Sequence, residues 1–232
     1  MADRFFTPDA LAPGEYVLTG PEAHHLAAVR RFGAGDRVVL FNGDGNDHPA
    51  EVVAADRKRT LVQVFPAEAA DRELPFPLEV AAALPKGDRG DYLVEKLTEL
   101  GVTRFTPLVT ERSVVQPKES RLEKLQHAVI EASKQCGRNV LMRVAPLTTW
   151  AAFLATAGLP PLRLVLHTAG DQVPLKTLEG GVGGVVIAVG PEGGFTTDEV
   201  AAAAGWVRVG LGPRVLRVET AAVTAAGWFA LR

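Results

Sequence analysis

The chain of 232 residues contains a single cysteine, Cys136, and only five histidines. One cysteine cannot build a disulfide framework or a cysteine-rich zinc cluster. His24 and His25 are adjacent, so they point to different faces of a helix, and no other His or Cys is suitably spaced. We therefore expect no metal site.

Long hydrophobic runs and a strong net charge are also missing. No stretch approaches 18 uninterrupted apolar residues, and the polar start Met1–Arg4 lacks a signal-peptide pattern, so we expect a cytoplasmic protein with no membrane segment. The formal charge of −2 argues against nonspecific coating of nucleic acid. The charge is unevenly distributed: residues 1–72 contain 8 basic and 11 acidic side chains, whereas residues 86–143 contain 11 basic and 8 acidic side chains. A local basic surface is compatible with this distribution.

Several signatures of nucleotide binding and catalysis are absent as well. The glycine loops do not have Gly-x-Gly-x-x-Gly spacing, and no Gly-Lys-Ser/Thr follows them, which argues against dinucleotide and P-loop sites. A Gly-x-Ser-x-Gly elbow is also missing, which argues against a serine nucleophile of the hydrolase type.

The strongest positive signal lies in residues 184–220. The apolar, mostly β-branched run Val185–Val189 is typical of a strand buried on both faces, and it opens into the glycine loop Gly190–Gly194. Thr196-x-x-Glu199 is a capping box that predicts a helix, and Val207–Leu211 predicts the next strand. A second glycine turn and a final helix to Leu231 follow. The two loops can surround a small ligand with main-chain groups, which favours an enzyme; alternatively, both are only tight turns.

The pattern changes near residue 72, which predicts two domains of an α/β protein, residues 1–72 and 73–232. The first part has short β-like runs separated by hairpin turns and one helix, Pro21–Arg31, as expected for a small β-barrel. The second part alternates strands and helices, which predicts a mainly parallel sheet. In such a sheet the ligand crevice lies at the carboxyl ends of the strands. Predicted strands and helices are Leu78–Leu84, Asp91–Leu100, Val102–Val109, Ser120–Arg138, Thr149–Ala157 and Leu162–His167.

Some polar residues have two interpretations. Glu131, Gln135 and Arg138 share a helix face by their spacing, either as a functional surface or as a solvated face. The loop Lys86–Gly90 follows a strand and either binds phosphate or is a simple turn. Arg112 is either a phosphate clamp or a surface charge.

At these residues the chain resembles a known family. The motifs that carry the resemblance occur in order over nearly the whole chain: Arg4–Phe6, His24–Arg31, Glu95–Val102, Glu131–Arg138, Gly190–Gly194 and Leu211–Ala221. Together they are similar to the RsmE family, the ribosomal RNA small-subunit methyltransferases that modify N3 of a uridine. No single motif is specific, but the ordered set is.

The resemblance implies a fold and a cofactor. The amino-terminal β-barrel would be a PUA-like RNA-binding domain, and the second domain a SPOUT methyltransferase domain with a trefoil knot. The cofactor would be S-adenosyl-L-methionine, and the protein a homodimer that acts on 16S rRNA or the small ribosomal subunit. Residues implied to hold the cofactor are Leu166, His167, Gly190, Glu192, Gly193, Gly194, Leu211, Gly212, Leu216 and Thr220. Residues implied to contact RNA are Arg4, Arg30, Arg31, Arg112, Gln135 and Arg138.

The implied reaction also suggests catalytic residues. The N3–H of uracil is weakly acidic, so the enzyme must favour the anion and hold N3 close to the methyl group. Arg217 is the first candidate to stabilise the negative charge, and Glu192 or Glu219 is a candidate proton acceptor. Two rival interpretations are a SPOUT methyltransferase that acts on another RNA atom and a non-catalytic RNA-binding factor. An NAD-binding oxidoreductase is less well supported, because its fingerprint is missing.

Overall fold

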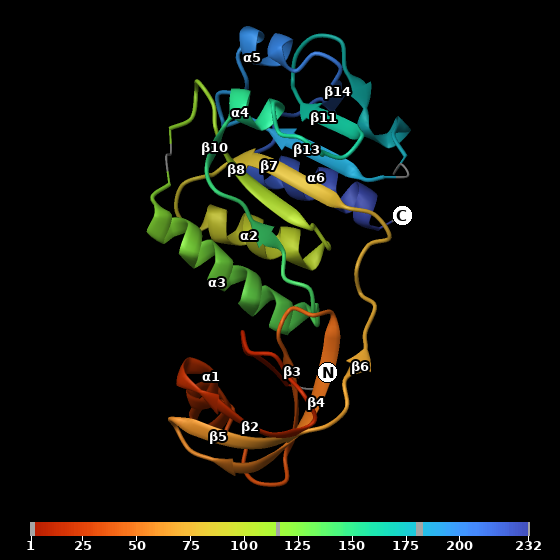
Figure 1. Ribbon diagram of the computed structural model, residues 1–232. Helices are drawn as coiled ribbons and strands as arrows, with labels where there is room; N and C mark the ends of the chain where they lie inside the picture. The colour runs from red at the N-terminus through yellow and green to blue at the C-terminus, as the bar shows by residue number, and fades with distance from the viewer. Residues whose placement is uncertain (1–2, 115–116, 180–182, 232) are drawn as a thin grey trace. The chain divides into compact units, whose positions relative to one another are not determined.

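The computed structural model describes residues 3–114, 117–179 and 183–231 (Figure 1). The chain forms two compact units, each described separately below. The first unit consists of Met1–Glu73 and Ser133–Leu141, and the second of Leu74–Ala132 and Met142–Arg232. The chain therefore returns to the first unit for nine residues before it completes the second.

The first unit is built on a six-stranded, mostly antiparallel sheet with the order β1-β3-β4-β5-β2, and β6 pairs with β4. Its elements are β1 (Arg4–Phe6), β2 (Gly14–Thr19), α1 (Gly20–His24), the π-helix His25–Val29, β3 (Arg37–Phe41), β4 (Asn46–Ala55), β5 (Arg59–Val64) and β6 (Glu68–Ala69). The hairpins β3–β4 and β4–β5 turn at Asn42–Gly45 and Asp56–Lys58, where the sequence predicts hairpin turns. Among the described residues no pairing joins the edge strands β1 and β2, so the sheet is a half-open barrel.

Alternate residues of these strands form the core of the first unit. Leu18, Val38, Leu40 and Val62 are buried together with Leu26 of the π-helix. This follows from the two-residue period of a strand, which directs every second side chain to the same face.

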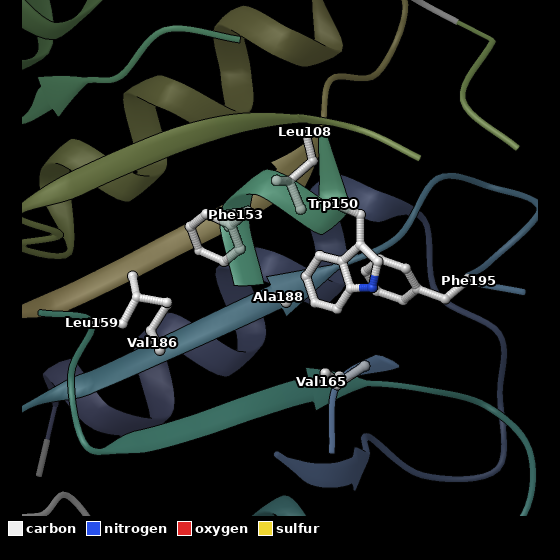
Figure 2. Close-up of a cluster of buried hydrophobic side chains, with 10 residues drawn as sticks. Leu108, Trp150, Phe153, Leu159, Val165, Val186, Ala188 and Phe195 are labelled. Carbon is white, nitrogen blue, oxygen red and sulfur yellow. The ribbon is translucent and has the colours of Figure 1, made fainter. Parts of the chain in front are cut away.

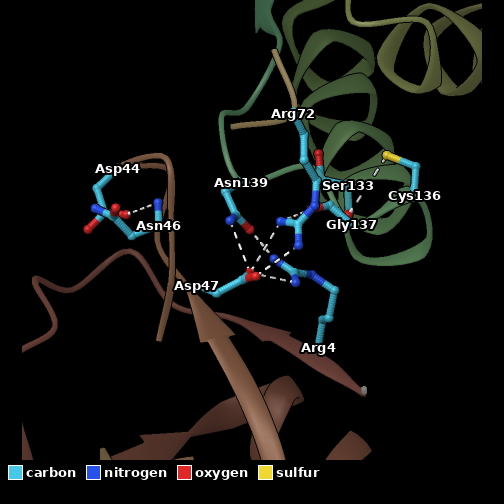
Figure 3. Close-up of polar contacts among 9 residues, drawn as sticks. All are labelled: Arg4, Asp44, Asn46, Asp47, Arg72, Ser133, Cys136, Gly137 and Asn139. Atoms are coloured by element: carbon cyan, nitrogen blue, oxygen red, sulfur yellow. Dashed lines mark hydrogen bonds and ion pairs between the residues drawn. The ribbon is translucent and has the colours of Figure 1, made fainter. Parts of the chain in front are cut away.

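A polar cluster lies at one end of the first unit (Figure 3). The carboxylate of Asp47 accepts hydrogen bonds from Arg4 at 2.7 Å, Arg72 at 2.9 Å and Asn139 at 3.0 Å. Burial raises the pKa of Asp47, but the hydrogen bonds from Arg72, Arg4 and Asn139 outweigh it and lower the pKa to about 2. Because Asn139 belongs to the second segment of the unit, this cluster ties residues 133–141 to the strands.

The second unit contains an eight-stranded sheet in which all strand pairs are parallel. Its strand order is β10-β8-β7-β13-β11-β14-β12, and β9 pairs with β8. The strands are β7 (Leu78–Ala83), β8 (Arg104–Val109), β9 (Arg143–Val144), β10 (Thr148–Thr149), β11 (Leu162–Leu166), β12 (Val173–Pro174), β13 (Val185–Val189) and β14 (Val207–Gly210). The helices are α2 (Arg89–Glu99), α3 (Glu119–Cys136), α4 (Trp150–Leu154), a 3-10 turn (Leu175–Thr177), α5 (Thr197–Ala202) and α6 (Val218–Ala230).

Both faces of this sheet are covered by helices, α4 and α5 on one side and α2 and α6 on the other (Figure 1). Val186 and Ala188 of β13 contact an aromatic cluster in which the Trp150 ring lies 4.6 Å from the ring of Phe195 (Figure 2). α6 packs against β7 and β13. Every residue of β13 is buried, which explains why its sequence is apolar without alternation.

The fold class predicted from the sequence is confirmed: a small β domain of PUA-like type is followed by a mainly parallel α/β domain of SPOUT type. The trefoil knot stays a prediction. Two details differ from the predictions. The second half of the predicted helix Pro21–Arg31 is a π-helix. The sequence places Cys136 on the apolar stripe of the predicted helix Ser120–Arg138, which predicts a core position, but Cys136 is only half-buried.

Candidate active site

A cavity of about 290 Å³ lies at the carboxyl ends of three neighbouring strands of the second unit, β13, β11 and β14. Because the strands are parallel, the segments that follow them meet at the same edge of the sheet. The lining residues are Leu166, His167, Thr168, Val189, Gly190, Pro191, Glu192, Gly193, Gly194, Val209, Leu211, Gly212, Arg214, Val215, Leu216, Val218 and Ala221.

The glycine loop Gly190–Gly194 forms one wall of this cavity, and its shape depends on the missing side chains. A Cβ at Gly190 would lie 3.0 Å from the amide nitrogen of Phe195 and 3.2 Å from the carbonyl carbon of Gly194. Gly194 has a φ of +70°, and its N–H donates to the carbonyl of Pro191 at 2.7 Å. The capping box at Thr196 starts α5 directly after the loop, as predicted. The loop is therefore a tight turn whose main chain faces the cavity.

The cavity has apolar walls and few charged groups. His167, Glu192 and Arg214 are its titratable lining residues. Burial, helped by the positive charge of Arg208, lowers the pKa of His167, so this imidazole stays neutral at pH 7. Apolar walls, exposed main-chain groups and one carboxylate fit a flat purine base joined to a positively charged group.

Most of the residues predicted to hold the cofactor are brought together here. Nine of the ten line the cavity, and the tenth, Thr220, is exposed and is not among its lining residues. Arg217, the predicted catalytic cation, also lies outside the lining. It is the exposed N-cap residue of α6, between the lining residues Leu216 and Val218.

An ion-pair cluster that the sequence did not reveal lies beside the glycine loop. Arg89, at the start of α2, donates to the carboxylate of Glu192 at 3.2 Å, and its guanidinium lies 3.8 Å from the carboxylate of Glu219. Glu219 is buried in the first turn of α6. The only hint in the sequence was the loop Lys86–Gly90, whose partners are more than 100 residues away along the chain. The two candidate proton acceptors thus share one cation.

Two of the predicted RNA contacts are not supported by the structure. Arg138 is 3% exposed and holds Glu73 through two nitrogens, at 2.8 and 2.6 Å. Since α3 ends at Cys136, Arg138 lies outside the helix, and the prediction that it shares an exposed face with Gln135 is wrong. Arg4 is 8% exposed, and its guanidinium donates a hydrogen bond to the carboxylate of Asp47. Both guanidinium groups stabilise the first unit instead of facing solvent.

The other predicted RNA contacts are exposed. Arg30 forms an ion pair with Asp3, and Arg31 adopts a φ of 60°, which is uncommon for a side-chain-bearing residue. Gln135 is exposed on α3. Arg112 is exposed and donates to the carbonyl of Gly193 at 2.7 Å, so it supports the glycine loop.

The described ranges 3–114, 117–179 and 183–231 hold neither a metal-binding cluster nor a helix able to cross a membrane. They contain no group of three or more His, Cys, Asp or Glu side chains arranged to hold a metal ion. Within the same ranges, every helix is too short or too polar to cross a membrane.

Comparison with known proteins adds the family. Residues 72–230 match the model of the RNA methyltransferase domain, and residues 18–65 match the RNA methyltransferase PUA domain. The chain is 34% identical to ribosomal RNA small subunit methyltransferase E of Synechocystis sp., over 94% of this chain and 73% of that protein. It is 30% identical to the protein of the same name from Bacillus subtilis, over 90% of this chain and 87% of that protein.

Solved structures show the same similarity. A ribosomal RNA small subunit methyltransferase E from Neisseria gonorrhoeae bound to S-adenosyl methionine superimposes with a TM-score of 0.89 at 31% identity, covering 97% of this chain and 95% of the other. A methyltransferase from Legionella pneumophila with bound cofactor SAM gives a TM-score of 0.91 at 31% identity, covering 97% and 96%. With a family model over most of its length and relatives of this similarity, the chain belongs to the family of RNA methyltransferases that includes the ribosomal RNA small subunit methyltransferases E.

Proposed function

We propose that this protein transfers a methyl group from S-adenosyl-L-methionine to N3 of a uridine in small-subunit (16S) ribosomal RNA. The observation that carries the proposal is the 290 Å³ cavity formed by the Gly190–Gly194 loop, the turn at Gly212 and the start of α6. The relatives with bound cofactor belong to the same family, and the chain covers nearly their full length.

The residues of the cavity fit this cofactor. Leu166, Val189, Leu211 and Val218 offer apolar surface to an adenine ring, and the glycine loop offers main-chain donors and acceptors at close range. The carboxylate of Glu192 attracts the positive charges of the cofactor. When bound, the cofactor supplies an electrophilic methyl group, whose C–S bond breaks with both electrons left on sulfur while the N3 electron pair forms the new N–C bond.

The remaining chemistry falls to the protein. The N3 proton must leave the uracil ring, and Glu192, half-exposed on the wall of the cavity, is placed to accept it. Arg217 lies at the N-cap of α6, next to two lining residues, and would stabilise the negative charge on the uracil oxygens. Glu219 shares Arg89 with Glu192 and is the second candidate acceptor.

We propose that the two parts of the chain divide the task. Residues 1–72, with the PUA-like sheet, would serve mainly to bind RNA, and residues 73–232 would carry out methyl transfer and add further contacts to RNA. Arg30, Arg31, Arg112 and Gln135 remain the proposed RNA contacts, acting mainly through phosphates. A cytoplasmic homodimer is part of this proposal.

The proposal is tested by incubating the purified protein with labelled S-adenosyl-L-methionine and either free 16S rRNA or small ribosomal subunits, and by mapping the product. Methylation at N3 of one uridine is the expected result. A methyl group on a ribose oxygen or on another base atom would favour the first rival function. Failure of the protein to bind the cofactor in a calorimeter would favour a non-catalytic RNA-binding factor.

The catalytic roles are tested with the variants Arg217→Ala and Glu192→Gln. We expect Arg217→Ala to lower turnover roughly 100-fold, as for loss of one charge-stabilising donor, with unchanged cofactor affinity. Arg163→Ala is the matched control, because Arg163 lies near the amino end of β11, at the opposite end of the strand from the cavity. Activity of Arg217→Ala at the level of the control would exclude the proposed role.

A further inference from the structure

A second cavity of about 280 Å³ adjoins the first in the second unit. Its polar lining side chains are Lys86, Arg89, Ser113 and Glu192, and Val114 and Pro191 contribute apolar surface. Pro191 and Glu192 line both cavities, so the two cavities meet at this part of the glycine loop. Two ligands placed in these cavities would therefore both contact Pro191 and Glu192.

The loop that carries Lys86 is held in a defined shape. Arg121 of α3 donates to the carbonyl of Gly87 at 3.2 Å and forms an ion pair with Asp91 at 2.8 Å. Gly87 has a φ of +64°, and a Cβ at Gly90 would lie 3.0 Å from a nitrogen of Arg121. The positive φ of Gly87 favours glycine in this turn, and Lys86, the residue before it, lines the second cavity.

The two cations of this cavity differ in their partners. Arg89 is engaged by the carboxylates of Glu192 and Glu219, so it helps to position Glu192, which lines both cavities. Lys86 is exposed, and within the described part of the chain it forms no hydrogen bond or ion pair with another residue. Its ammonium group is thus available to a ligand.

We propose that the second cavity receives the acceptor pyrimidine base and that Lys86 stabilises the negative charge of the base while N3 is deprotonated. This inference rests on the proposed function and names a residue that carries part of it. The apolar surface of Val114 and Pro191 suits the flat faces of a base. As the N3 proton passes to the carboxylate of Glu192, the negative charge spreads over N3 and both ring oxygens, and a lysine ammonium is a mobile donor to such oxygens.

The position of the base is tested by photocrosslinking. After the methylated nucleotide has been mapped, 4-thiouridine is placed at that position of the substrate RNA and irradiated with the unaltered protein. We expect crosslinked peptides that contain residues 83–89 or 113–114. Methyl transfer by the unaltered protein with crosslinks only outside these segments would overturn the inference alone. Absence of any methyl transfer would instead contradict the proposed function and the inference with it.

The role of Lys86 is tested with Lys86→Gln. We expect kcat/KM for RNA to fall roughly 100-fold, with cofactor affinity measured by calorimetry unchanged. In RNA that carries 5-fluorouridine at the acceptor position, where fluorine makes the N3–H more acidic, the loss should be smaller, because less stabilisation of the anion is needed. The matched control is Lys176→Gln, an exposed lysine on the 3-10 turn after β12, at the far edge of the sheet. Equal kcat/KM for both variants, or an equal loss with uridine and 5-fluorouridine, would refute the role.

Discussion

Replacing Gly190 with alanine is the sharpest test of the cofactor cavity. Gly190 directly follows β13, and its φ lies outside the left-handed region, so its backbone accepts alanine. The obstacle is space: the new Cβ would lie 3.0 Å from the Phe195 amide nitrogen and 3.1 Å from the Phe195 ring. Phe195 is buried against Trp150, so neither group can move away freely.

The magnitude follows from this overlap. Adding one carbon to a closely packed site typically costs about 1–3 kcal/mol. If the loop shifts to relieve the overlap, the main-chain groups that face the cavity move with it. A loss of this size corresponds to a cofactor dissociation constant that is about 5- to 150-fold higher.

Calorimetric titration with S-adenosyl-L-methionine measures this effect, and tryptophan fluorescence reports the displacement of Phe195 from Trp150. Gly193→Ala is the matched control in the same loop, because the three nearest neighbours of its new Cβ are side-chain atoms of Arg112, with the Cβ and Cδ at 3.3 Å, and none is a main-chain atom. We expect a much smaller loss for this variant. Equal affinities for Gly190→Ala and the unaltered protein, or a larger loss for Gly193→Ala, would refute this account of the cavity.

Three other predictions follow from single contacts. Asp47→Asn should lower the free energy of unfolding in urea by about 2–4 kcal/mol, because it leaves the buried Arg4 guanidinium without its carboxylate. The pKa of Asp47 is lowered to about 2 in the folded protein, so the stability that its carboxylate contributes is complete above the ordinary value of 3.8 and is lost as the pH falls through about 2. When the free energy of unfolding is measured against pH, Asp47→Asn should lack this acid-induced loss. An identical loss in Asp47→Asn and the unaltered protein would contradict this role of Asp47. Thr196→Ala removes the hydroxyl that accepts a hydrogen bond from the Glu199 amide, so it should lower the free energy of thermal unfolding by about 1 kcal/mol. The control Thr224→Ser, at an exposed position, should leave this free energy unchanged. Burial and then the charge of Arg208 lower the pKa of His167 below its ordinary value of 6.5, so cofactor affinity should stay constant above that pH and weaken only below it. His167→Asn should remove this pH dependence in the calorimeter.

Local patterns in the sequence predicted the elements that form the cavity. The unbroken apolar run at Val185–Val189 became a fully buried central strand, and Thr196-x-x-Glu199 became a complete capping box. Both features depend on interactions within a few residues, which a single sequence displays directly. The short strands β1, β6, β9, β10 and β12 were not predicted, because two or three residues carry too little periodicity.

The partners of charged side chains were harder to predict. Arg138 was predicted to face RNA, but it is buried against Glu73, 65 residues away along the chain. Arg89 was read as part of a simple turn or phosphate loop, but it joins Glu192 and Glu219. Spacing along one helix shows which side chains share a face, but not which distant carboxylate lies opposite.

By itself, the sequence determined the alternation of strands and helices, the two glycine loops and the family. Periodicity, capping boxes and short motifs each depend on residues that are close together along the chain, so a single sequence displays them directly. Only the tertiary structure decided which loops meet. The order β7-β13-β11-β14 brings carboxyl ends as distant along the chain as Ala83 and Gly210 to one edge of the sheet. Two adjoining cavities lie there, and beside them Arg89 is paired with carboxylates whereas Lys86 is exposed and available to a ligand. Which charged side chains are paired and which are available depends on burial and on long-range contacts, and these exist only once the chain has folded.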